Sequence, residues 1–157
     1  MITIKKGNHR SNLRFPLLTF KKSIKVEVKF IGDFSYSIKK QKDTNKLFGL
    51  SDSYHHHKDS VRVGWRWNNI VKKVELMVIV YSGGNRTIKH LRYLPINKRI
   101  TIELEVKEGE YIIKLNNDEY SFERTSKWWF LRYGLFPFFG GTTVAPKDFK
   151  FTIKKIT

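Results

Sequence analysis

The segment of residues 54–67 decides the fold, and it reads Tyr54-His55-His56-His57-Lys58-Asp59-Ser60-Val61-Arg62-Val63-Gly64-Trp65-Arg66-Trp67. Its second half alternates between apolar and other residues, and a period of two is typical of a β-strand with one buried face. The buried face would carry Val61, Val63, Trp65 and Trp67. The open face would carry Arg62, Gly64 and Arg66. The segment therefore predicts a half-buried strand that presents two arginines on either side of a glycine.

The same signature recurs along the chain, separated by turn-forming residues. Residues 24–30 and 99–106 alternate apolar and polar positions, as strands with one solvated face do. Residues 74–81 are apolar on both faces, which indicates a strand inside a sheet. Further strands are predicted at residues 2–5, 46–50, 87–94, 111–115, 120–122 and 148–156. Residues 82–85, Ser-Gly-Gly-Asn, form a hairpin signal between two of these strands.

Other segments read as loops or edges. Residues 15–18 are apolar but contain a proline, which suits an edge or a crossing segment. Residues 39–45 form a polar loop. No window keeps the spacing of a helix, and roughly ten to twelve short strands are typical of a sandwich or barrel. We expect one all-β domain over residues 1–157, an antiparallel two-sheet β-sandwich of the jelly-roll or concanavalin-like type with one concave face.

The charge of the chain limits its partners. Its 157 residues include 31 Lys and Arg against 14 Asp and Glu, a formal charge of +17. This excess favours polyanions, namely an acidic protein surface, an acidic glycan, an anionic membrane or nucleic acid, although solubility alone is an alternative explanation. No nucleic-acid-binding motif accompanies the charge. The apolar runs are too short to span a membrane, and no apolar signal segment follows Met1, so neither a transmembrane helix nor a secretory signal peptide is expected.

The histidines are the first candidates for chemistry. On a strand, His55 and His57 would share a face. Zinc requires three or four ligands, and the chain has no cysteine and no further spaced ligand set. We therefore expect no metal and no cofactor, and we interpret the histidines as packing and hydrogen-bonding groups that also contribute to a binding surface.

Elimination on an acidic sugar requires an arginine or asparagine that neutralises the sugar carboxylate, and a tyrosine or histidine that acts as a base. Arg62, Arg66, one of the histidines and either Tyr81 or Tyr133 supply these types. No motif fixes their relative positions. The alternative is that the arginines form a solvated strand face, or are satisfied internally.

Residues 128–139 are the most aromatic part of the chain. Trp128 lies close in sequence to Arg132, and an exposed ring beside a cation is a platform on which sugars or bases stack. The alternative is that most of these rings belong to the core, because a sandwich of this length needs large apolar residues between its sheets.

Several segments carry a resemblance to known proteins. They are residues 4–9, residues 45–49, the block from His56 to Arg66, and residues 137–146 with Pro-Phe-Phe-Gly-Gly and Ala-Pro. Together they resemble a loose group of small all-β proteins of Bacteroides-type bacteria and their phages. The chain is more distantly similar to concanavalin-like jelly rolls, which include lectins and alginate-type lyases. It has neither the Gln-x-His strand nor the Tyr-Phe-Lys-x-Gly strand of those lyases.

These observations lead to one main hypothesis and several alternatives. The main hypothesis is a non-enzymatic docking protein, an auxiliary component of a phage particle, that binds an acidic protein surface and resides in the virion or the cytoplasm. The alternatives are a carbohydrate-binding module and an acidic-polysaccharide lyase, with nucleic-acid binding as a further one. The expected contact residues are Arg62, Arg66, His55, His57, Trp128 and Arg132.

Overall fold

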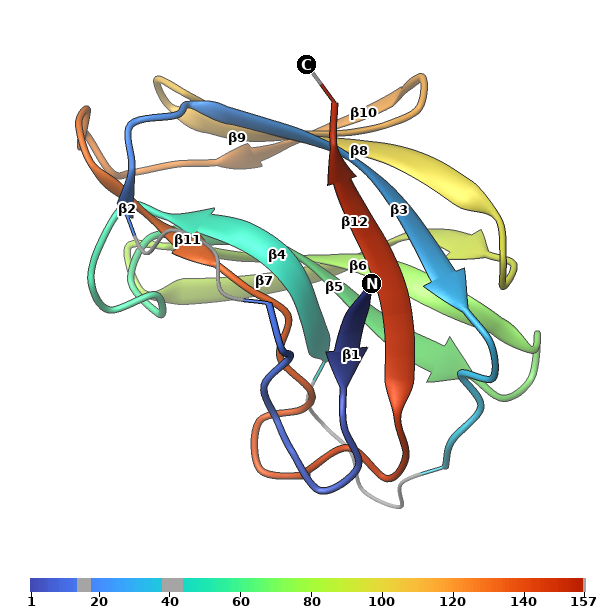
Figure 1. The fold of residues 1–157 in the computed structure, drawn as a ribbon. Helices are drawn as coiled ribbons and strands as arrows, with labels where there is room; N and C mark the ends of the chain where they lie inside the picture. The colour runs from blue at the N-terminus through green and yellow to red at the C-terminus, as the bar shows by residue number, and fades with distance from the viewer. Residues whose placement is uncertain (14–17, 38–43, 157) are drawn as a thin grey trace.

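The computed structural model describes residues 1–13, 18–37 and 44–156, which form two antiparallel sheets (Figure 1). The first sheet has the order β1 (Ile2–Ile4), β12 (Phe149–Lys155), β3 (Ser23–Ile31), β8 (Arg99–Lys107), β9 (Glu110–Leu115) and β10 (Asp118–Glu123). The second has the order β2 (Leu18–Thr19), β11 (Arg132–Leu135), β4 (Asn45–Ser51), β5 (Ser60–Asn68), β6 (Lys73–Ser82) and β7 (Asn85–Leu94). The predicted jelly-roll β-sandwich is confirmed.

Helices are absent from the described residues. Accordingly, none in this part of the chain is long and apolar enough to cross a membrane.

The strand at the centre of the second sheet is β5, which pairs with β4 and β6. Its apolar face points into the core as predicted, with Trp65 fully buried and Trp67 half-buried. Five rings, from the first sheet and from loops, surround the Trp65 indole edge-on, at centroid distances of 5.2 to 6.3 Å. They are Phe30, Phe34, Tyr36, Phe139 and Phe149. Large rings in such edge-to-face contacts contribute strongly to core stability.

The neighbouring strand β6 is buried on both faces, as its continuous apolar sequence predicts. Its outward side chains Met77 and Ile79 are almost inaccessible. Thr44, just before β4, contributes to this cover: its hydroxyl donates to the Met77 sulfur at 3.8 Å. Phe138 exchanges two backbone hydrogen bonds with Lys46, at 2.8 and 3.0 Å, which brings the segment after β11 to the same side. Thr44 and the segment around Phe138 therefore cover part of the outer face of the second sheet.

Gly64 permits this close approach. A Cβ at Gly64 would lie 2.6 Å from Thr44 Cγ2 and 2.9 Å from the Asn45 carbonyl oxygen. Gly49, opposite Arg62 on β4, is equally restricted, because its Cβ would meet the Val61 carbonyl oxygen and the Arg62 side chain. The two glycines allow β4 and the Arg62 side chain to pack where any larger residue would displace them.

One detail differs from the sequence-based prediction: residues 54–58 form a bend and turn instead of the start of a strand. The segment 15–18 lies mostly outside the described residues, but Leu18 begins the edge strand β2. Most of the predicted 39–45 loop is likewise outside them, and Asn45 already belongs to β4. The first and last strands, β1 and β12, pair with each other.

Candidate functional site

A pocket of about 280 Å³ lies on the outer face of the second sheet, beside the hairpin that joins β6 to β7. Its lining residues are Thr44, Lys46, His57, Arg62, Ile79, Tyr81, Arg86, Ile88, Gly141 and Thr142. We call it the outer-face pocket. Four strands and three connecting segments contribute to it, so residues up to 98 positions apart in sequence meet there.

Arg62 is the most buried of the cations in this pocket, with 6% of its surface exposed. It lies on the outward face of β5 and donates from Nη2 to the His56 carbonyl oxygen at 3.0 Å. Its guanidinium carbon is 5.7 Å from the centre of the Tyr81 ring, a cation–π contact. Burial lowers the pKa of Arg62 to about 10, so the side chain is still a cation at neutral pH. Its buried Nε has no hydrogen-bond partner among the described residues.

His57 and Tyr81 lie next to each other in the pocket, with ring centroids 5.1 Å apart. The turn that carries His57 is held against the sheet by the His56 carbonyl oxygen, which accepts from both Ser60 and Arg62. Partial burial lowers the pKa of His57, and the positive charge of Arg62 lowers it further. His57 is therefore a neutral imidazole at neutral pH, the form that accepts a proton.

The pocket is electrostatically one-sided. Lys46, Arg62 and Arg86 contribute three cations, and its described lining includes no carboxylate. Lys46 donates to the Gly140 carbonyl oxygen at 2.9 Å, which positions its ammonium group at the wall. Within the described parts of the chain, neither Arg62 nor Arg86 forms an ion pair. A recessed cluster of like charge raises the local concentration of anions.

Arg66, predicted to act together with Arg62, lies elsewhere. Four residues along a strand separate the two by about 13 Å. Arg66 is half-exposed and donates to Glu75, whose buried carboxylate also contacts His90 at 2.8 Å. The two arginines therefore do not form one open basic strip: one lines the outer-face pocket, and the other is paired within a separate Arg66–Glu75–His90 cluster.

Arg132 is not placed to meet a ligand. Its side chain is 1% exposed, and its Nε donates to Asp52 at 2.9 Å. Asp52 also accepts from Arg124 and from the Tyr111 hydroxyl, so this buried network joins the two sheets. Arg132 was expected to contact a partner, but in the structure its charge is already neutralised inside the protein by Asp52.

The other two predicted contact residues are exposed but outside the pocket. Trp128 is half-exposed; its indole nitrogen donates to the Leu131 carbonyl oxygen at 2.7 Å. His55 is exposed in the turn before β5 and packs edge-on against Tyr54 at 5.4 Å. Tyr54 in turn contacts Tyr133, and Tyr133 is not among the described residues that line the outer-face pocket. No group of three or more potential metal ligands occurs among the described residues.

Sequence reasoning missed two of the three cations of the pocket, Lys46 and Arg86. Arg86 had a usable signal, because the hairpin turn at residues 82–85 places it directly opposite Tyr81. No sequence signal placed Lys46 in the pocket, because its position there depends on the pairing of β4 with β5 and on the segment that contains Gly140.

Comparison by sequence finds no matching family model and no matching curated protein. The fold, in contrast, is similar to solved structures. The alginate lyase AlyC3 matches 97% of this chain and 74% of that chain, with a TM-score of 0.59 and 14% sequence identity. An alginate lyase from Alteromonas sp. 272 matches 85% of this chain and 71% of that chain, at a TM-score of 0.51 and 7% identity. The family 7 alginate lyase A1-II′ matches 85% of this chain and 61% of that chain, with a TM-score of 0.51 and 10% sequence identity. At such identities the likeness shows the fold alone.

Proposed function

We propose that this protein binds an acidic polysaccharide in the outer-face pocket and cleaves it by β-elimination. One observation carries the proposal: Arg62, His57 and Tyr81 line a single pocket whose described lining holds no carboxylate. These are the three residue types that the reaction requires. The concave, recessed shape also favours a ligand that enters a pocket over a flat protein surface.

The cations would act first on the substrate carboxylate. Arg62 and Arg86 pair with the uronate carboxylate at C6. This pairing neutralises the negative charge of the carboxylate and makes the proton on the neighbouring C5 more acidic. Arginine suits this role because its planar guanidinium can contact both carboxylate oxygens. The buried position of Arg62 strengthens the interaction, since it operates at low local dielectric.

Proton transfer would fall to the adjacent ring pair. Neutral His57 takes the proton from C5, and the electron pair of that bond forms the C4=C5 double bond as the C4–O bond breaks. The Tyr81 hydroxyl donates its proton to the departing glycosidic oxygen. His57 ends as the cation and Tyr81 as the anion, and solvent restores both. Positioned acids and bases of this kind accelerate reactions by about 10²–10⁴-fold each.

The test is the growth of absorbance near 235 nm, the band of the unsaturated product, on polymannuronate, polyguluronate and polygalacturonate. The wild type should show it on at least one polymer. Tyr81→Phe should reduce the rate about 100-fold or more while binding is retained. Arg66→Ala, at the separate cluster, should leave both rate and binding unchanged.

Two results would count against the proposal in different ways. If a polymer binds saturably but the absorbance at 235 nm does not grow, the β-elimination is excluded and the protein is a carbohydrate-binding protein. If none of the three polymers binds, both polysaccharide binding and β-elimination are excluded. The docking protein of a phage particle, which the sequence favoured, would then be the next hypothesis; neither the fold nor the comparisons support it.

A further inference from the structure

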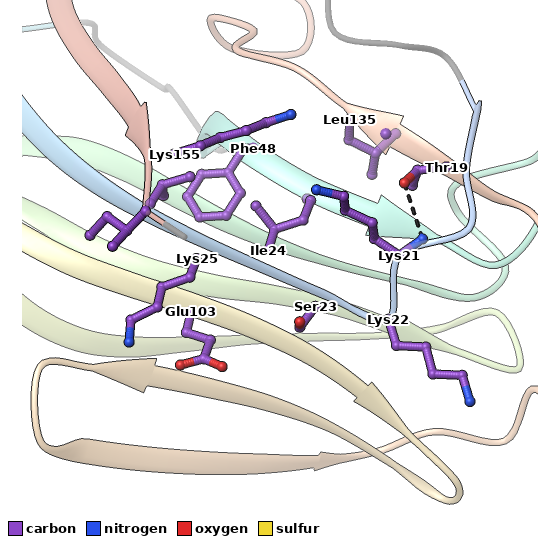
Figure 2. A pocket seen from close by; sticks show the side chains of 14 residues that line it. Thr19, Lys21, Lys22, Ser23, Ile24, Lys25, Phe48, Glu103, Leu135 and Lys155 are labelled. Atoms are coloured by element: carbon purple, nitrogen blue, oxygen red, sulfur yellow. Dashed lines mark hydrogen bonds between the residues drawn. The ribbon is translucent and has the colours of Figure 1, made fainter.

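A second pocket, of about 590 Å³, opens between the two sheets on the side where β2 and β3 meet β4 and β11 (Figure 2). It shares no lining residue with the outer-face pocket. We call it the inter-sheet pocket. Its volume is within the range of roughly 300–1,000 Å³ that is usual for small-molecule sites. Nothing in the proposed elimination uses it.

The inner part of this pocket is apolar. Phe48 and Val26 are buried side chains at its inner wall, one from each sheet. Ile24 and Leu135, both half-buried, extend the apolar surface toward the opening, and Figure 2 shows Phe48, Ile24 and Leu135 grouped there. A wall of this kind offers no hydrogen-bond partner to a sugar hydroxyl, so a carbohydrate would lose hydrogen bonds on entry.

The opening is strongly basic. Lys21, Lys22, Lys25 and Lys155 line it, and Glu103 is the single carboxylate among the described lining residues. In the part of the chain that the structure describes, none of these four lysines takes part in an ion pair. Figure 2 shows the Lys21 and Lys155 side chains extending from opposite sides toward the region of Phe48 and Ile24, while Lys22 and Lys25 point away from it.

We propose that the inter-sheet pocket binds a single-chain amphiphile with an anionic head group, whose hydrocarbon chain lies against Phe48, Val26 and Ile24. The head group pairs with Lys21 and Lys155 at the opening. Burial of each methylene group of the chain adds to the driving force for binding. The lysine stems cover the upper part of the chain, while their ammonium groups stay at the water boundary.

Calorimetry at ligand concentrations below micelle formation tests the site. Dodecanoate and dodecyl phosphate distinguish a carboxylate from a phosphate source, and dodecyltrimethylammonium carries the same chain with the opposite charge. At least one anion should bind the intact chain with a stoichiometry of one. The cation should bind at least about tenfold more weakly, because the head group meets lysines instead of carboxylates.

Two variants locate the binding. Lys21→Ala combined with Lys155→Ala should weaken anion binding about tenfold. The matched control, Lys73→Ala with Lys98→Ala, removes two exposed lysines outside the pocket and should change nothing. Leu135→Trp should fill the apolar part and abolish binding, with the melting temperature recorded to confirm that the variant is folded.

Several outcomes would overturn the proposal. They are no saturable binding of either anion, equal binding of the cation, unchanged binding in folded Leu135→Trp, and displacement of the anion by an oligouronate. The proposal stands or falls separately from the elimination, because Tyr81→Phe should bind the amphiphile like the wild type.

Discussion

Asp52 and Arg132 form an ion pair closed off from solvent, with 2.9 Å between Oδ1 and Nε and 1% of each side chain exposed. Asp52 follows β4 in the second sheet, yet its other carboxylate oxygen accepts from Tyr111 of β9 and from Arg124, which follows β10, at 2.7 and 2.8 Å. One carboxylate thus joins the two layers of the sandwich. Burial, followed by the charge of Asp52, raises the pKa of Tyr111, so the phenol remains a donor to Asp52.

Asp52→Asn should therefore destabilise the protein by about 3–5 kcal/mol, because it leaves two buried guanidinium groups without their counter-charge. Chemical denaturation measures this. Asp33→Asn is the matched control: Asp33 pairs with Lys147 at the surface, and an exposed pair contributes about 0–1 kcal/mol. Equal costs for the two substitutions would show that the buried network has no special role.

Trp65→Ala should cost about 3–5 kcal/mol, since it opens a cavity among five aromatic rings. Trp67→Ala, on the same face of β5 but half-buried, should cost clearly less. Denaturant unfolding of both variants provides the comparison. A Trp65→Ala protein that melts like the parent would refute the placement of this ring.

Gly64→Ala should destabilise by about 1–3 kcal/mol, because the new methyl group meets Thr44 Cγ2 and the Asn45 carbonyl oxygen. Adding Thr44→Ser removes the Cγ2 methyl and should restore part of the loss. Thermal unfolding of the two single variants and the double variant checks this. Strict additivity of the two single changes would exclude the proposed steric contact.

Arg86→Ala should weaken the binding of acidic oligosaccharides about tenfold, because Arg86 lines the outer-face pocket and pairs with no carboxylate of the described chain. It should also flatten the dependence of affinity on salt, since one charge is lost from the contact. Arg66→Ala is the control of equal charge. If both substitutions weaken binding equally, the effect is due to overall charge and not to the pocket.

The pH dependence of the elimination follows from His57. Burial and the charge of Arg62 lower its pKa below 6.5, and the base must be neutral, so the rate should be constant near neutrality and fall as pH drops through that lowered value. Arg62→Gln removes one of the lowering charges and should move this acid limb to higher pH. A limb centred above pH 7 in the wild type would exclude His57 as the base.

Much of the fold could be predicted from local patterns. The alternation at residues 61–67 correctly assigned the buried face of β5, and the continuous apolar run at residues 74–81 correctly placed β6 inside a sheet. The hairpin signal at residues 82–85 implies the pairing of Tyr81 with Arg86 that the structure has. These features are local, because side-chain direction in a strand alternates with a period of two whatever the strand pairs with.

The tertiary structure alone decided what each polar side chain of those strands meets. Arg62 and Arg66 share a face of β5, but the turn at residues 54–58 and the Gly49 contact enclose the first, while Glu75 pairs with the second. Arg132 lies near Trp128 in sequence and donates to its carbonyl oxygen at 3.3 Å, but its guanidinium is buried against Asp52 and forms no platform with the indole ring. A charge takes its role from the groups that approach it in space. In an antiparallel sandwich those groups come from strands far away in sequence, whose pairing no local pattern encodes.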